Sequence, residues 1–219
     1  CVMSHPPYLH KASKEGVYQY YKTVAESVNI GVMVYNFPNV SGTLIPPDLM
    51  ARLSKIENIV ALKDVTPKAI DNVYNALMID PEDMVLIDGN GELNYVGSAA
   101  NGAIYRGFIS FIADFAPRQS YSIYEAVEAE NFKKAHEVLK KTFFPLFSFM
   151  DRVESSRESI SALPWWMGIG TTTISIIKVA MDLVGLRGGP YHQAQLPTEG
   201  LTDEEKKDLK GVLKEIGVI

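Results

Sequence analysis

Two side chains that could do chemistry together follow apolar segments of the sequence. Lys63 follows the run Ile59–Leu62, and Tyr35 follows Gly31–Val34, 28 positions earlier. A neutral amine can add to a ketone and form an imine, and a nearby phenol can pass protons to and from the departing oxygen. An ordinary interpretation is also open for each: a lysine that reaches solvent from a strand end, and a tyrosine that packs its ring.

Both residues lie where short strands are expected to end. Apolar runs of this length are typical of buried strands, and Pro38 limits the earlier strand to Tyr35 or Asn36. Between them, Pro46–Ser54 has prolines at a first turn and apolar residues at helical spacing, which predicts a helix. Strand, helix and strand with short connections form a right-handed parallel unit. Tyr35 and Lys63 should therefore open onto the same face.

The alternation of strands and helices continues through the first half of the chain and then stops. Further strands are predicted at Cys1–Ser4, Met84–Asp88 and Gly102–Ile104, and further helices at Lys14–Ser27, Pro67–Leu77 and Leu93–Ala99. From Phe115 onward only helices are predicted, at Arg118–Glu128, Phe132–Val153, Thr172–Val184 and Asp203–Ile216. Thr202 and Glu205 occupy capping-box positions at the last one. The pattern indicates a parallel α/β region followed by a helical one.

Composition excludes several classes of protein. With 47% apolar and 21% charged residues among 219, the chain can bury a substantial core. A net charge of −5 argues against a nucleic-acid binder. We find no signal peptide, no membrane span and one cysteine, Cys1, so a cytoplasmic protein is expected. The four histidines are scattered, which argues against a metal site.

Three segments, Val34–Pro38, Ser41–Gly42 and Ala61–Asp64, resemble the dihydrodipicolinate synthase/N-acetylneuraminate lyase family. The resemblance runs along nearly the whole chain and implies an α/β fold, the (β/α)8 TIM barrel. It also implies that the chain begins at strand four and lacks roughly the first three strands. Residues 1–116 would then hold strands four to eight with their helices. Residues 117–219 would hold the last barrel helix and a C-terminal helical subdomain.

The resemblance also assigns roles to particular residues. Lys63 would form a Schiff base with pyruvate or another 2-oxo acid, with no cofactor beyond this covalent imine, and Tyr35 would relay protons. Substrate-binding positions would be Gly42, Gly89, Glu92 and the backbone carbonyl of Ile104. A turn glycine remains an alternative for Gly42, and a solvated helix residue for Glu92. By family analogy we expect a homo-oligomer, a tetramer, with no nucleic-acid or membrane partner.

Departures from the family pattern shape the functional prediction. Val40 stands where dihydrodipicolinate synthases have an arginine, Leu9 where they have a second tyrosine, and Val65 where sialic-acid lyases have a threonine. We therefore expect an aldolase or hydro-lyase acting on a 2-keto-3-deoxy sugar acid. Alternatives are a dihydrodipicolinate synthase, which joins pyruvate and aspartate semialdehyde, and a non-catalytic barrel fragment. A flavodoxin-like domain is a weaker alternative, because no phosphate-binding glycine loop follows an early strand.

Overall fold

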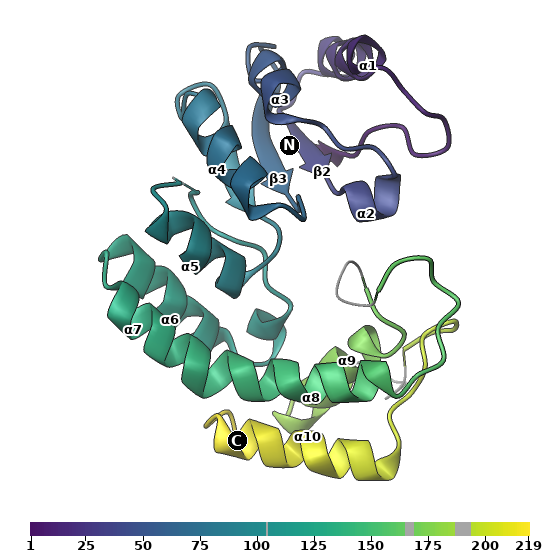
Figure 1. Cartoon of the computed structure of the whole chain (residues 1–219), viewed down its shortest axis with the longest axis vertical. Helices are drawn as coiled ribbons and strands as arrows, with labels where there is room; N and C mark the ends of the chain where they lie inside the picture. Colours follow the sequence, from purple (N-terminus) through teal and green to yellow (C-terminus); the bar gives the residue numbers. More distant parts are fainter. Residues whose placement is uncertain (104, 165–168, 187–193) are drawn as a thin grey trace. The chain divides into compact units, whose positions relative to one another are not determined.

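The computed structural model describes the chain except for residues 104, 165–168 and 187–193 (Figure 1). It divides into two compact units, Cys1–Ile109 and Ser110–Ile219. In the described part of the chain, no helix has the length and apolar character needed to cross a membrane.

The first unit contains a parallel sheet of four strands in the order β1-β2-β3-β4. The strands are β1 (Val2–Ser4), β2 (Val32–Asn36), β3 (Ile59–Asp64) and β4 (Val85–Asp88). The helices between and after them are α1 (Lys14–Glu26), α2 (Pro38–Ser41), α3 (Pro47–Leu53), α4 (Ala69–Met78) and α5 (Glu92–Ala100). The predicted parallel α/β architecture is confirmed.

The core of the first unit follows from the spacing of apolar residues. Val17, Tyr21 and Ala25 recur every four positions along α1 and are buried, as expected for one face of an amphipathic helix. In β2, Val32 and Val34 are fully buried and alternate with half-buried neighbours. This alternation directs every second strand residue toward the helices.

The predicted strand at Gly102–Ile104 is wrong in the residues that the structure describes there. Gly102 adopts a left-handed backbone (φ +81°) in the turn that ends α5, so strand pairing begins later. A single parallel bridge joins Phe108 to Asp88, with the Ile109 N–H donating to the Asp88 carbonyl at 2.8 Å. Ile104 lies outside the described residues.

The second unit is helical, as predicted. Its described helices are η1 (Ile112–Asp114), α6 (Pro117–Glu128), α7 (Phe132–Val138), the π segment η2 (Leu139–Phe143), α8 (Phe144–Ser155), α9 (Thr173–Leu183) and α10 (Asp203–Glu215). The helix predicted over Phe132–Val153 is therefore interrupted by a π turn, just before Pro145, which has no N–H for an i−4 carbonyl. The capping box of Thr202 and Glu205 is confirmed.

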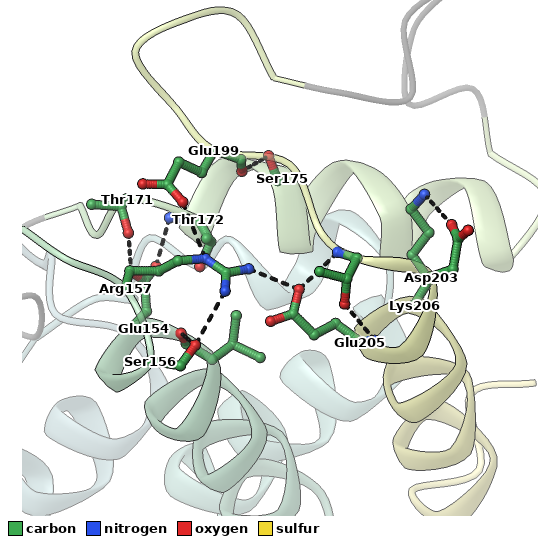
Figure 2. Close-up of polar contacts among 12 residues, drawn as sticks. Glu154, Ser156, Arg157, Thr171, Thr172, Ser175, Glu199, Asp203, Glu205 and Lys206 are labelled. Carbon is green, nitrogen blue, oxygen red and sulfur yellow. Dashed lines mark hydrogen bonds and ion pairs between the residues drawn. The ribbon is translucent and has the colours of Figure 1, made fainter.

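A buried carboxylate joins α8 to the start of α9 (Figure 2). Glu154 is 5% exposed, and its side chain accepts hydrogen bonds from Thr171 Oγ1 at 3.0 Å, the Thr172 N–H at 3.0 Å and Thr173 Oγ1 at 2.8 Å. The Thr172 side chain makes no capping bond of its own. Glu154 therefore supplies the N-terminal cap of α9 from another helix.

An ion-pair cluster at Arg157 joins the end of α8 to the start of α10 (Figure 2). The guanidinium lies 2.7 Å from Glu205 and 3.3 Å from Glu199. Glu205 also accepts the Thr202 N–H at 2.7 Å within the capping box. One carboxylate thus serves both the helix cap and the contact between helices.

Candidate active site

Tyr35 and Lys63 lie side by side at the carboxyl ends of β2 and β3. They are partners in the register of these parallel strands, and Lys63 Nζ lies 4.2 Å from the centroid of the Tyr35 ring. Both side chains are half-buried. Lys63 Nζ lies over the ring, and within the described residues no hydrogen bond joins Nζ to Tyr35 Oη. The arrangement is a cation–π contact that keeps an amine next to a phenol.

A pocket of about 280 Å³ opens beside Tyr35. Its walls are mainly apolar and aromatic, and its lining residues are His5, Tyr8, Tyr35, Phe37, Val40 and Ser41. Lys63 is not one of them, and no lysine or arginine lines the pocket in the part of the chain described. The His5 Nδ1 atom lies 2.7 Å from the Pro6 carbonyl, and the Ser41 hydroxyl already bonds backbone carbonyls. The pocket therefore offers few free polar groups to a ligand.

Strands β3 and β4 each end in an aspartate. Both aspartates lie on the face of the sheet opposite to the one that carries the Lys63 side chain. Asp64 and Asp88 are register partners on β3 and β4, and both are fully buried. The pKa of Asp88 is raised to about 7, chiefly by burial and to a smaller extent by the charge of the nearby Asp64. Hydrogen bonds from Asn94 Nδ2 and the Asn90 N–H oppose that shift. Burial, followed by the charge of Asp64, also raises the pKa of Tyr105, so this phenol remains a hydrogen-bond donor.

The two predicted substrate-binding glycines are required by different features of the backbone. Gly42 ends α2 with φ +66°, and nothing lies within 4 Å of a Cβ placed there, so the turn itself favours glycine. At Gly89 a Cβ would overlap the Val65 side chain and approach the Asp64 carbonyl. The Gly89 N–H donates to that carbonyl at 2.7 Å. Gly89 therefore allows the loop after β4 to lie against the end of β3.

Glu92 and Ile104 complete the predicted set. Glu92 is the first residue of α5 and is 3% exposed, so it is a buried residue rather than a solvated one. Ile104 falls outside the described residues. Sequence reasoning overlooked Asn36, Asp64 and Thr66, which are fully or almost fully buried just behind the lysine and tyrosine. For Asn36 and Asp64 the available signal was their position, since each is a polar residue directly after a proposed reactive residue.

Comparison with known proteins places this chain in a family. The model of the dihydrodipicolinate synthetase family matches residues 1–216. A 4-hydroxy-tetrahydrodipicolinate synthase from Archaeoglobus fulgidus is 31% identical over 213 residues, covering 97% of this chain and 65% of that protein. The crystal structure of a dihydrodipicolinate synthase from Bacillus anthracis is 29% identical with a TM-score of 0.73, covering 97% of this chain and 64% of that one.

A monomeric dihydrodipicolinate synthase variant has a TM-score of 0.78 at 24% identity, covering 99% of this chain and 65% of that chain, a likeness of fold. These matches confirm the fold class expected above, α/β of the (β/α)8 barrel type. The chain spans about 65% of the length of the relatives that it matches. Since the family model matches nearly every residue, the chain belongs to the dihydrodipicolinate synthetase family.

Proposed function

We propose that this chain carries the imine-forming part of a lyase that acts on pyruvate or a related 2-oxo acid, with Lys63 as the nucleophile. The observation that carries the proposal is the in-register placement of Lys63 beside Tyr35, with Nζ 4.2 Å from the ring centroid. Family membership supports it: the resemblance implies a Schiff-base lysine at this position, and the relatives are named 4-hydroxy-tetrahydrodipicolinate synthases.

The chemistry begins with the neutral amine of Lys63. Nζ adds to the keto carbon, and the resulting carbinolamine loses its oxygen as water to give an iminium ion. Tyr35 is suited to give a proton to that departing oxygen, which leaves as water. It can take a proton back from the attacking water when the imine is hydrolysed. The iminium then accepts the electron pair released when a proton, or a carbon–carbon bond, is lost from the neighbouring carbon. No cofactor is needed for these steps.

Two activities are candidates for this site. The names of the relatives favour dihydrodipicolinate synthase activity, in which the pyruvate-derived enamine adds to aspartate semialdehyde. A 2-keto-3-deoxy sugar acid is the second candidate. Val40 and the absence of lysine or arginine among the pocket's lining residues favour it, because the described pocket offers no guanidinium or lysine amine to a second carboxylate.

Borohydride trapping tests the proposal. Incubation with pyruvate and sodium borohydride should attach a reduced pyruvate adduct to the peptide that contains Lys63. Lys63→Ala should abolish the label, whereas Lys68→Ala, which removes an exposed lysine five positions away, should retain it. A label on a different lysine would contradict the role of Lys63, and no label on the unchanged chain would contradict the proposal and leave the non-catalytic alternative. Turnover with aspartate semialdehyde or a 2-keto-3-deoxy sugar acid then separates the two substrates.

Assembly and location are part of the same proposal. We propose a homo-oligomer, a tetramer by family analogy, working in the cytoplasm. Light scattering of the purified protein measures its mass directly, and a monomer would contradict the proposed assembly.

A further inference from the structure

The residues that follow Tyr35 and Lys63 form a second register pair. Asn36 and Asp64 are partners across β2 and β3, and both are 0% exposed. Successive strand side chains point to opposite faces, so this pair lies directly behind the proposed reactive pair. Asp64 contacts Asn75 of α4, which places it on the helix-covered face of the sheet. Any movement of these two residues along their strands would move Tyr35 and Lys63 as well.

Thr66 connects the two members of the buried pair. Asn36 Nδ2 donates to Thr66 Oγ1 at 3.0 Å, and Thr66 Oγ1 donates to Asp64 Oδ1. A hydroxyl has a single proton. Because Thr66 donates that proton to the Asp64 carboxylate, its oxygen can only accept a hydrogen bond from the Asn36 amide. The hydrogen bonds therefore run in one direction, from β2 through Thr66 to β3. The Thr66 N–H also donates to Asp64 Oδ1, at 3.1 Å.

Both ends of this hydrogen-bond chain are anchored elsewhere in the first unit. Asp64 Oδ2 accepts from Asn75 Nδ2 at 2.7 Å and from the Tyr105 hydroxyl at 2.8 Å. Asn36 donates to the Ile45 carbonyl at 3.0 Å and accepts the Ile45 N–H at 3.1 Å. The Asp64 carboxylate thus accepts from four donors, two on each oxygen, and a buried carboxylate bonded in this way favours one geometry.

Between β2 and β3 the backbone gives the strand ends little other support, because the Gly89 N–H that bonds the Asp64 carbonyl at 2.7 Å joins β3 to the loop after β4 and not to β2. The pairing of β2 with β3 ends where the Val65 N–H donates to the Asn36 carbonyl at 2.8 Å. Pro38 and Pro67 follow two or three residues later and cannot donate to a sheet. Side chains must then hold the last residues of β2 and β3 to each other.

We propose that Asn36, Thr66 and Asp64 are positioning residues whose hydrogen-bond chain holds the ends of β2 and β3 so that Lys63 stays beside Tyr35. This inference rests on the proposed function, because it concerns how the Lys63 amine is presented to a 2-oxo acid. Reactivity depends steeply on such placement: a shift of about 1 Å can slow a reaction by about 100-fold.

The test compares three variants of the purified protein by borohydride trapping, at increasing pyruvate concentrations. Thr66→Val replaces the hydroxyl with a methyl group of similar size and breaks the link. Thr66→Ser keeps the hydroxyl. Ser54→Ala removes a buried hydroxyl in the same unit that bonds only the Ala51 carbonyl, away from the strand ends. If Thr66→Val does not fold, Thr66→Ala removes the hydroxyl without placing a methyl group against Asp64.

We expect Thr66→Val to lower the saturating rate of Lys63 labelling by about 10- to 100-fold, with a smaller change in the pyruvate concentration for half-saturation. Thr66→Ser should restore most of the rate, and Ser54→Ala should leave it unchanged. A merely structural threonine would lower thermal stability without changing the labelling rate of the folded protein. Labelling of Thr66→Val at the unchanged rate would overturn the positioning role and leave the proposed function intact. Absence of labelling in the unchanged chain would overturn both.

Discussion

Replacing Asp88 with asparagine should remove a pH dependence from the stability of the first unit. The folded pKa of Asp88 is about 7, against an ordinary value of 3.8, chiefly because the carboxyl is buried. Well below the ordinary value of 3.8 both the folded and unfolded states hold the proton, so the shift has little effect. As the pH rises toward 7, the unfolded state gives up its proton more easily, and folding becomes less favourable. The full penalty is about 4 kcal/mol, of which about 2.5 kcal/mol develops between pH 5 and pH 8.

Urea unfolding at half-unit pH steps between 5 and 8, followed by circular dichroism, measures this effect. The unfolding free energy of the unchanged protein, minus that of Asp88→Asn, should fall by about 2.5 kcal/mol across the range. A constant offset between the two proteins is not the signal, because asparagine also changes hydrogen bonds. Asp48→Asn is the control: Asp48 is exposed, and its hydrogen bond to Lys14 lowers its pKa. Its difference curve should be flat. An equally flat curve for Asp88→Asn would show that the folded protein does not raise the pKa of Asp88.

Three further predictions concern stability and can be checked by the same urea unfolding. Gly89→Ala should destabilise the protein by about 1–3 kcal/mol, because the added Cβ would meet the end of β3. Gly97→Ala, in open space on α5, should be neutral or stabilising. Equal effects of the two substitutions would contradict this prediction. Glu154→Ala should lower the unfolding free energy by about 2–4 kcal/mol, because it leaves buried donors unpaired. Arg152→Ala, in an exposed ion pair, should lower it by less than about 1 kcal/mol. The reverse order would be inconsistent with these contacts. Thr202→Ala should cost about 1 kcal/mol through the lost cap of α10, and no change would mean that this cap contributes nothing.

Local patterns were sufficient to predict most elements of the chain. β3 has the predicted limits, Ile59–Asp64, because its apolar run ends in charged residues. The capping box at Thr202 was visible because its two members are three residues apart. The juxtaposition of Tyr35 and Lys63 also followed from local elements, since strand, helix and strand leave little choice of topology.

Features that depend on distant or competing interactions were not predictable in this way. The fifth strand was placed too early because Gly102 looks like part of an apolar run, although its backbone is left-handed. Thr66 carried no signal of its own, because its link to Asn36 spans 30 residues. The burial of Glu92 was equally hidden, since a glutamate at a helix start is compatible with solvent.

The cap that Glu154 supplies to α9 has a consequence for the order in which the second unit can form. An isolated helix of 11 residues is marginal in water, and this one lacks a cap within its own segment. A synthetic peptide covering Thr173–Leu183 should therefore show little helicity. During synthesis on the ribosome, α8 emerges first, so its acid is already in place when the threonines at residues 171–173 arrive. The chain direction thus supplies the start of α9 with its partner in advance, and a rearranged gene that made α9 before α8 would lose that advantage.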